Sequence, residues 1–126
     1  MRSDSIRLLV ADDLRLGQPV RTSLLLTDEA RDRVIDSTYH AWHEMQCIAV
    51  DGEVDAVILN GTTLRVDDFS AEAEQALREG MSLLVEAGIR IVLHPGEDQH
   101  RAFWREFLST DDELRDGVSL IAGSNQ

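Results

Sequence analysis

Four carboxylate side chains stand directly after two apolar runs of the sequence, Asp12 and Asp13 after the first run and Glu97 and Asp98 after a later one. Carboxylate oxygens are the ligands that hard cations such as Mg²⁺ and Ca²⁺ prefer. If the fold brings the two segments together, the four carboxylates can form an acidic rim that binds a cation weakly. A solvated rim balanced by Arg15 is the alternative interpretation.

Histidines supply a second group of residues with metal-ligand chemistry. His40 lies one helical turn from both His43 and Glu44, a spacing that can chelate a metal. A solvent-exposed helix face explains the same spacing, and we expect that outcome. His94 and His100 flank the later carboxylate segment, where we expect a hydrogen-bonding loop histidine rather than a metal ligand.

The elements that position these residues follow from hydrophobic patterning. Thr27 and Ser70 are expected to cap helices that end at Gly52 and Gly88, and a short helix is expected over about residues 99–108. Apolar runs predict short buried strands at residues 6–11, 55–59, 89–93 and 118–122.

This alternation of strands and helices predicts one α/β domain over residues 1–126. We expect a three-layer α/β/α arrangement with a mostly parallel sheet and helices on both of its faces. In such a sheet the loops that follow the strands share one edge, where ligands bind. The carboxylate segments and the loop after residues 55–59 are therefore expected to meet.

Three segments at strand ends resemble a known family in order and spacing: residues 11–17, 59–64 and 95–99. They are similar to the first three motifs of the calcineurin-like metallophosphoesterases, and most similar to the nuclease subunit of the bacterial SbcCD DNA-repair complex. That family reads Asp-x-His, then Gly-Asp, then Gly-Asn-His-Asp. The resemblance extends over residues 6–122.

Most of the family's ligand positions carry other residues in this chain. Asp13 keeps the first acid, but Arg15 stands in place of the His, and Thr62 replaces the bridging Asp. In the third motif the positions of Asn, His and Asp are taken by Glu97, Asp98 and Gln99.

These replacements argue against the family's chemistry. A two-metal site needs a bridging carboxylate and neutral imidazoles to hold cations about 3.5–4 Å apart. Thr62 cannot bridge two cations, and the permanent charge of Arg15 repels a metal. The resemblance therefore implies a vestigial site with no catalytic residue and no cofactor, unless Mn²⁺ or Mg²⁺ binds a rebuilt carboxylate site.

The resemblance covers only the first half of the family's two-sheet sandwich. Half of a sandwich would expose one face of its sheet, which predicts a homodimer or a protein partner, such as an SbcC-like ATPase. The leading hypothesis is a catalytically inactive domain that acts through protein contacts. The alternative is a divergent metal-dependent phosphodiesterase or exonuclease with a rebuilt carboxylate site.

The first strand also resembles the start of a response-regulator receiver domain, because Ile6–Ala11 leads into two acids. In receivers these acids hold Mg²⁺ beside a phosphorylated Asp. Here Asn60 stands in the position of that Asp, the chain has no Lys, and one long helix from Asp28 to about Val50 replaces the expected helix-strand-helix. A degenerate receiver is thus the third and least favoured hypothesis.

Composition limits the partners. The net charge is −12, and the 12 basic residues are all Arg and scattered, so direct binding to nucleic acid is not expected. No apolar run approaches a membrane span, and no signal peptide is evident, which favours a cytoplasmic protein.

The single cysteine, Cys47, is expected to be a small apolar filler within a helix. Aromatic side chains are expected in the core or at a contact with a partner, namely Trp42, Trp104 and the nearby Phe side chains.

Overall fold

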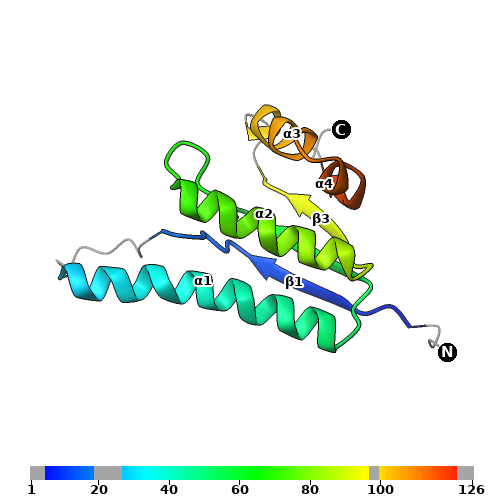
Figure 1. Cartoon of the computed structure of the whole chain (residues 1–126), viewed down its shortest axis with the longest axis horizontal. Coiled ribbons are helices and arrows are strands. Elements are labelled where there is room, and N and C mark those ends of the chain that lie inside the picture. The colour runs from blue at the N-terminus through cyan, green and yellow to red at the C-terminus, as the bar shows by residue number, and fades with distance from the viewer. Residues whose placement is uncertain (1–4, 19–26, 97–99, 122–126) are drawn as a thin grey trace.

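The computed structural model describes residues 5–18, 27–96 and 100–121, in which strands and helices alternate (Figure 1). Each of the first three strands extends one residue beyond its expected end, and a short helix that the sequence did not predict precedes the last strand. The elements are β1 Leu8–Asp12, α1 Asp28–Asp51, β2 Ala56–Asn60, α2 Ala71–Glu86, β3 Arg90–His94, α3 Arg101–Ser109, α4 Asp112–Gly117 and β4 Val118–Leu120.

The four strands form one sheet in the order β1-β2-β3-β4, and all neighbouring strands are parallel. The predicted α/β class with a parallel sheet is confirmed. Because the order along the sheet is the order along the chain, the carboxyl ends of β1, β2 and β3 lie side by side at one edge.

Both long helices begin at the expected caps. The Thr27 hydroxyl accepts a hydrogen bond from the Ala30 N–H at 3.0 Å, and the Ser70 hydroxyl accepts one from Ala73 at 3.0 Å. These bonds satisfy backbone donors that the first helical turn leaves without partners. After α2, Gly88 has a φ of 84°, the left-handed conformation that ends helices at low cost for glycine.

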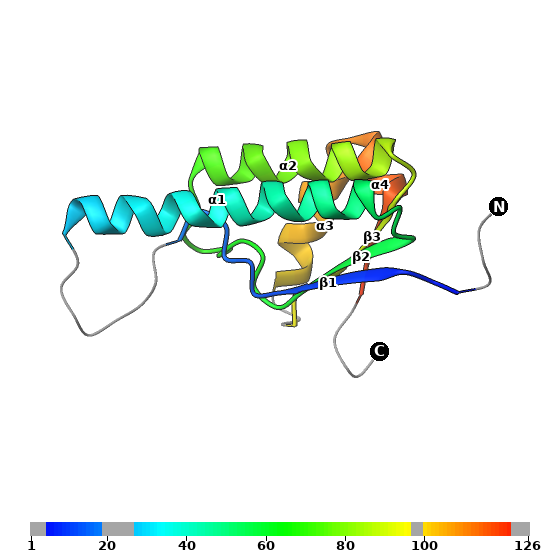
Figure 2. The ribbon, with the colours of Figure 1, turned by 90° about the horizontal axis from the view of Figure 1, so that it is seen from below.

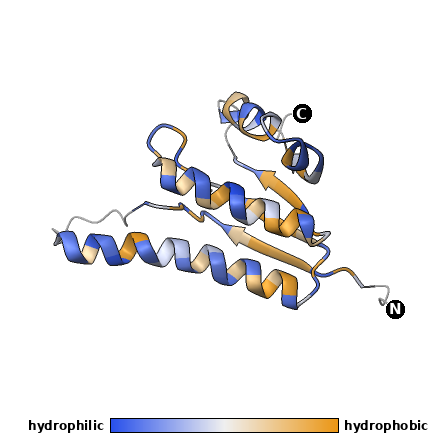
Figure 3. Ribbon diagram, in the orientation of Figure 1, coloured by the Kyte–Doolittle hydropathy of each residue, from blue (hydrophilic) through white to orange (hydrophobic). Residues whose placement is uncertain are grey.

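The hydrophobic core lies between the helices and one face of the sheet. Val57 and Leu59 of β2, and Ile91 and Leu93 of β3, alternate along their strands and are completely buried on this face. Helices α1 and α2 run side by side over the strands (Figure 2). Colouring by hydropathy shows β1 and β3 as apolar, whereas the helices mix apolar and polar residues (Figure 3).

A close contact joins α1 to α2. Trp42 of α1 is buried, and its indole N–H donates to the Ala76 carbonyl oxygen of α2 at 2.9 Å. The ring lies directly against Gly80, where a Cβ atom would overlap it. Glycine at this position therefore lets the indole ring and the helix backbone approach each other.

The opposite face of the sheet is apolar but poorly covered. Leu8 and Val10 of β1 are each 54% exposed, and Ile121 is 41% exposed. Ile58 and Val92 lie beside them and are half-buried. Among the described residues, none of these five belongs to the core cluster or to the apolar side chains packed against it. We call this surface, Leu8, Val10, Ile58, Val92 and Ile121, the open face.

Candidate functional site

Three polar residues end three neighbouring strands in register: Asp12 on β1, Asn60 on β2 and His94 on β3. The described parts of the three motif segments therefore meet at one edge of the sheet, as the topology predicted. Residues with the same pairing register point to the same side, which is the side of the open face.

Hydrogen bonds connect these three side chains into a row. The Asn60 amide donates from Nδ2 to Asp12 Oδ1 at 2.9 Å, and Asn60 Oδ1 lies 2.8 Å from His94 Nδ1. Because Nδ2 of Asn60 faces the Asp12 carboxylate, Oδ1 is the acceptor on the other side, and Nδ1 of His94 donates to it. We call this row, Asp12–Asn60–His94, the polar ladder.

Asp13 holds the loop that follows β2. Its Oδ1 accepts a hydrogen bond from the Thr62 N–H at 2.9 Å, and its own N–H donates to the Asn60 carbonyl oxygen at 2.8 Å. The loop passes so close that a Cβ atom on Gly61 would overlap the Asp13 carboxylate. Gly61 also has a φ of 77°, a conformation that costs other residues free energy. Asp13 therefore acts as a clamp on the loop.

The two loops continue to pair beyond this clamp. The Arg15 N–H donates to the Thr62 carbonyl oxygen at 2.9 Å, and the Leu16 N–H donates to that of Thr63 at 3.0 Å. Leu16 and Leu64 are buried in the core under the pairing. Thr63 is also buried, and in the described part of the chain its hydroxyl oxygen has no hydrogen-bond partner.

The Arg15 side chain extends from this pairing into solvent. Arg15 is exposed, with a φ of 47°, and it forms no ion pair with any described residue. Its expected acidic neighbours, Glu97 and Asp98, lie outside the described residues, as does Gln99. Their convergence with Asp12 and Asp13 stays a prediction.

No group of three or more His, Cys, Asp or Glu side chains within residues 5–18, 27–96 and 100–121 is arranged to hold a metal ion. His40, His43 and Glu44 are all exposed along α1, in agreement with the expected solvent face. His100 precedes α3 and forms no side-chain capping bond.

The prediction for Cys47 was wrong. Cys47 is exposed, and its Sγ lies 3.8 Å from His43 Nε2. The buried stripe of α1 runs through Trp42, Met45 and Ala49, and Cys47 falls on the other side of the helix.

The aromatic side chains pack as core residues. Trp104 and Phe107 of α3 are buried, with ring centroids 5.3 Å apart in an edge-to-face arrangement. Phe103 joins them and contacts Phe69 at 5.4 Å. The guanidinium of Arg78 lies 4.0 Å above the centre of the Phe107 ring. The partners in these ring contacts are side chains of the chain itself, as expected for aromatic residues of the core.

Neither a family model nor a curated protein matches the chain. The metallophosphoesterase resemblance therefore stays a prediction from the motifs. Within the described part of the chain, each helix is too short or too polar to cross a membrane.

Sequence reasoning missed the polar ladder, although it had considered each of its members separately. The sequence predicts Asp12 in a cation rim and His94 in a loop hydrogen bond. The available signal was position: each residue directly follows the apolar run of its strand, so a parallel sheet in sequential order brings them into register.

Proposed function

We propose that this chain is a non-catalytic, metallophosphoesterase-like domain that acts through protein contacts, and that its partner is a second copy of itself. The observation that carries the proposal is the open face. Val10 and Leu8 expose more than half of their surface on a face whose central residues are also apolar. Exposed apolar patches of this kind mark interaction sites in soluble proteins.

The chemistry at the strand ends supports a role other than catalysis. Asp13, which keeps the family's first acid, has one carboxylate oxygen engaged by the Thr62 N–H. Thr62 itself offers no carboxylate to bridge two cations, and Arg15 brings a positive charge to the same loop. These residues shape and clamp loops, which is a structural task.

Charge on the open face favours a second copy as partner. Arg90 begins β3 and Asp12 ends β1, so the two stand at diagonally opposite corners of this face. Arg90 is held there by its hydrogen bond to Ser119 Oγ at 2.7 Å. In a dimer in which the two open faces pack against each other, the two-fold axis lies in the plane between the copies. When this axis relates the two corners, Asp12 of each copy lies opposite Arg90 of the other.

This arrangement brings the apolar centres of the two open faces into contact and places their oppositely charged corners opposite each other. The apolar residues at the middle of the face, Val10, Ile58 and Val92, would become the core of a sheet-on-sheet interface. The strongly negative charge of the chain opposes association at long range, and salt screens that repulsion. Dimerisation is therefore expected to strengthen as salt rises from low to physiological concentration.

The test compares two matched substitutions. Val10 on the open face and Ile48 on α1 are both β-branched and both 54% exposed. Val10→Arg is expected to raise the dimer dissociation constant at least about tenfold, because it buries a charge without a partner. Ile48→Arg, which adds the same charge on the helical side, is expected to leave it unchanged.

Sedimentation equilibrium from micromolar to millimolar protein measures both constants. A wild-type chain that stays monomeric throughout would reject the second copy as partner. A different protein, such as an SbcC-like ATPase, would then be the occupant to consider. Equal weakening by Val10→Arg and Ile48→Arg would reject the open face as the interface.

The alternative function is a divergent metal-dependent phosphodiesterase with a rebuilt site. The polar ladder favours it, because one shared amide orients both Asp12 and His94, two side chains of the types that bind metals. Calorimetric titration with Mn²⁺, run beside Asp13→Ala, decides between the two functions. Micromolar, stoichiometric binding that is lost in Asp13→Ala would support the enzyme. An absence of binding would support the non-catalytic domain.

Two earlier expectations stay predictions. A receiver-like activity would require transfer of phosphate from a small phosphodonor to the chain, yet Asn60 is engaged in the polar ladder. A cytoplasmic location rests on the sequence alone.

A further inference from the structure

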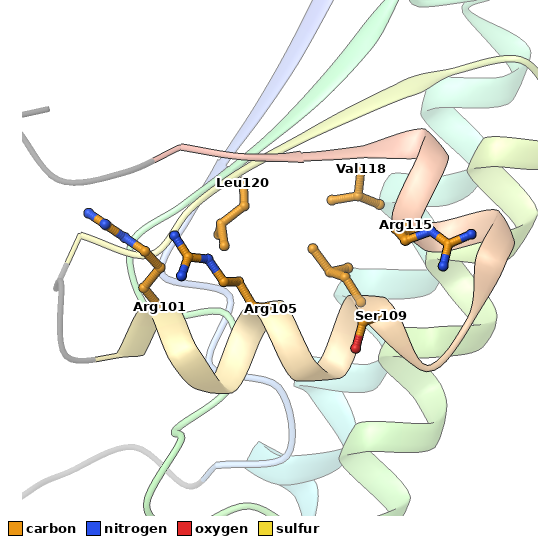
Figure 4. Close-up of a pocket in the computed structure, with 7 residues that line it drawn as sticks. Arg101, Arg105, Ser109, Arg115, Val118 and Leu120 are labelled. Carbon is orange, nitrogen blue, oxygen red and sulfur yellow. The ribbon is translucent and has the colours of Figure 1, made fainter.

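A cavity of about 260 Å³ lies between α3 and β4, on the helical side of the sheet and away from the open face. Its apolar lining consists of Leu108, Val118 and Leu120, of which Leu108 and Val118 are buried. Three arginines surround this apolar surface: Arg101, Arg105 and Arg115 (Figure 4).

The charge of this cavity is opposite to that of the chain. Acidic residues outnumber basic ones by 24 to 12 in the sequence, yet no acidic residue is among the described residues that line the cavity. A group of arginines beside an apolar wall concentrates positive potential where an anion would lie. Guanidinium groups also bind carboxylates and phosphates through paired hydrogen bonds.

The three arginines are not equivalent. Arg115 is paired with Asp112 at 3.0 Å and approaches Asp116 at 3.8 Å. Arg101 already takes part in an interaction, whereas Arg105 forms no ion pair or hydrogen bond with any described residue. Arg101 and Arg105 are four residues apart on α3, and Arg105 lies nearer to Leu120 while Arg101 lies further out at the edge of the cavity (Figure 4).

The start of α3 gives an independent indication. Helices α1, α2 and α4 carry acids in their first turns, which suits the positive end of the helix dipole. The first turn of α3 has no acid, begins with Arg101, and lacks a side-chain cap. Arg105 adds a positive charge one turn further along this helix, and a bound anion would interact with that charge and with the positive helix end.

We propose that this cavity binds a small amphipathic organic anion. Its carboxylate or phosphate head lies between Arg101 and Arg105, and its short apolar chain lies on Leu108, Val118 and Leu120. The volume is below the range of drug-sized pockets, which fits a chain of a few carbons. This site is separate from the open face and does not depend on the proposed dimer.

The experiment titrates the wild-type chain with hexyl phosphate and with hexanoate, and follows the methyl signals of Val118 and Leu120 by NMR. Saturable shifts are expected with at least one of these anions, and the stronger of the two identifies the head group. Inorganic phosphate, which lacks the apolar chain, and hexanol, which lacks the charge, are each expected to bind at least about tenfold more weakly.

Two variants that remove the same charge complete the test. Arg105→Gln is expected to weaken binding of the better anion about tenfold or more, because a charge-assisted contact is lost. Arg31→Gln, on the distant helix α1, is expected to leave binding unchanged. The proposal is overturned if neither amphiphile gives saturable shifts, if hexanol binds as tightly as the anions, or if both variants weaken binding equally.

Discussion

At the scale of single residues, the contact between Gly61 and Asp13 determines how the loop after β2 is held. Gly61→Ala is expected to destabilise the fold by about 1–2 kcal/mol from the left-handed backbone alone. Collision with the Asp13 carboxylate adds to this cost. Urea unfolding measures the free energy of unfolding of both the wild type and the variant.

A double-mutant cycle separates the two causes. In an Asp13→Ala background the collision is absent, so Gly61→Ala should cost less than it does in the wild type. An identical cost in both backgrounds would show that the backbone conformation is the whole effect, and that the carboxylate does not constrain Gly61.

The polar ladder supports a second prediction at this scale. Asn60→Asp removes the donor that Asp12 uses and places two carboxylates beside each other. We expect a loss of stability of about 1–2 kcal/mol that shrinks as salt screens the repulsion. Exchanging the two side chains, by combining Asp12→Asn with Asn60→Asp, should recover much of this loss. A swap that is no more stable than Asn60→Asp alone would contradict the ladder.

At the scale of elements, α1 and α2 are joined by the contact of Trp42 with Gly80. In an exposed helix, replacing Gly by Ala stabilises by up to about 1 kcal/mol. Here Gly80→Ala is expected to destabilise by about 1–3 kcal/mol, because the new methyl group overlaps the buried indole ring. Thermal unfolding would detect the change, and a higher melting temperature for Gly80→Ala would refute the close contact.

The helices were predictable because their signals are local. Thr27 and Ser70 are capping residues whose hydrogen bonds reach only three residues along the chain, and Gly88 ends α2 by its own backbone conformation. Helix α4 was missed because it spans only Asp112–Gly117, too short for a periodic apolar pattern to be visible.

The arrangement of elements could not be predicted in the same way. Which strands are neighbours depends on contacts between residues far apart in the chain, such as the pairing of Leu9 with Val57. The contact between α1 and α2 likewise follows from the strand order, and the local signals of the two helices do not contain it. The cavity beside β4 was missed for the same reason, because Arg105 and Leu120 meet only in the folded chain.

At the scale of the whole molecule, the proposed dimer depends on complementary corners of the open face. Asp12→Arg alone and Arg90→Asp alone are each expected to weaken dimerisation, because each places like charges opposite one another. The chain with both substitutions restores opposite charges and should dimerise more tightly than either single variant. Sedimentation of the three variants tests this arrangement, and a double variant weaker than both singles would reject the two-fold pairing of these corners.

The sequential strand order also bears on how the chain is assembled during synthesis. Each strand pairs with the one made just before it, from β1 through β4. As the polypeptide leaves the ribosome, every completed strand and helix can therefore dock onto structure that already exists, without waiting for a distant segment to emerge. In a sheet whose first strand lay between two later strands, one side of β1 would stay unpaired until a strand from further along the chain had been synthesised. Here vectorial folding from β1 to β4 is built into the topology, because each new strand meets a pairing edge that is already formed.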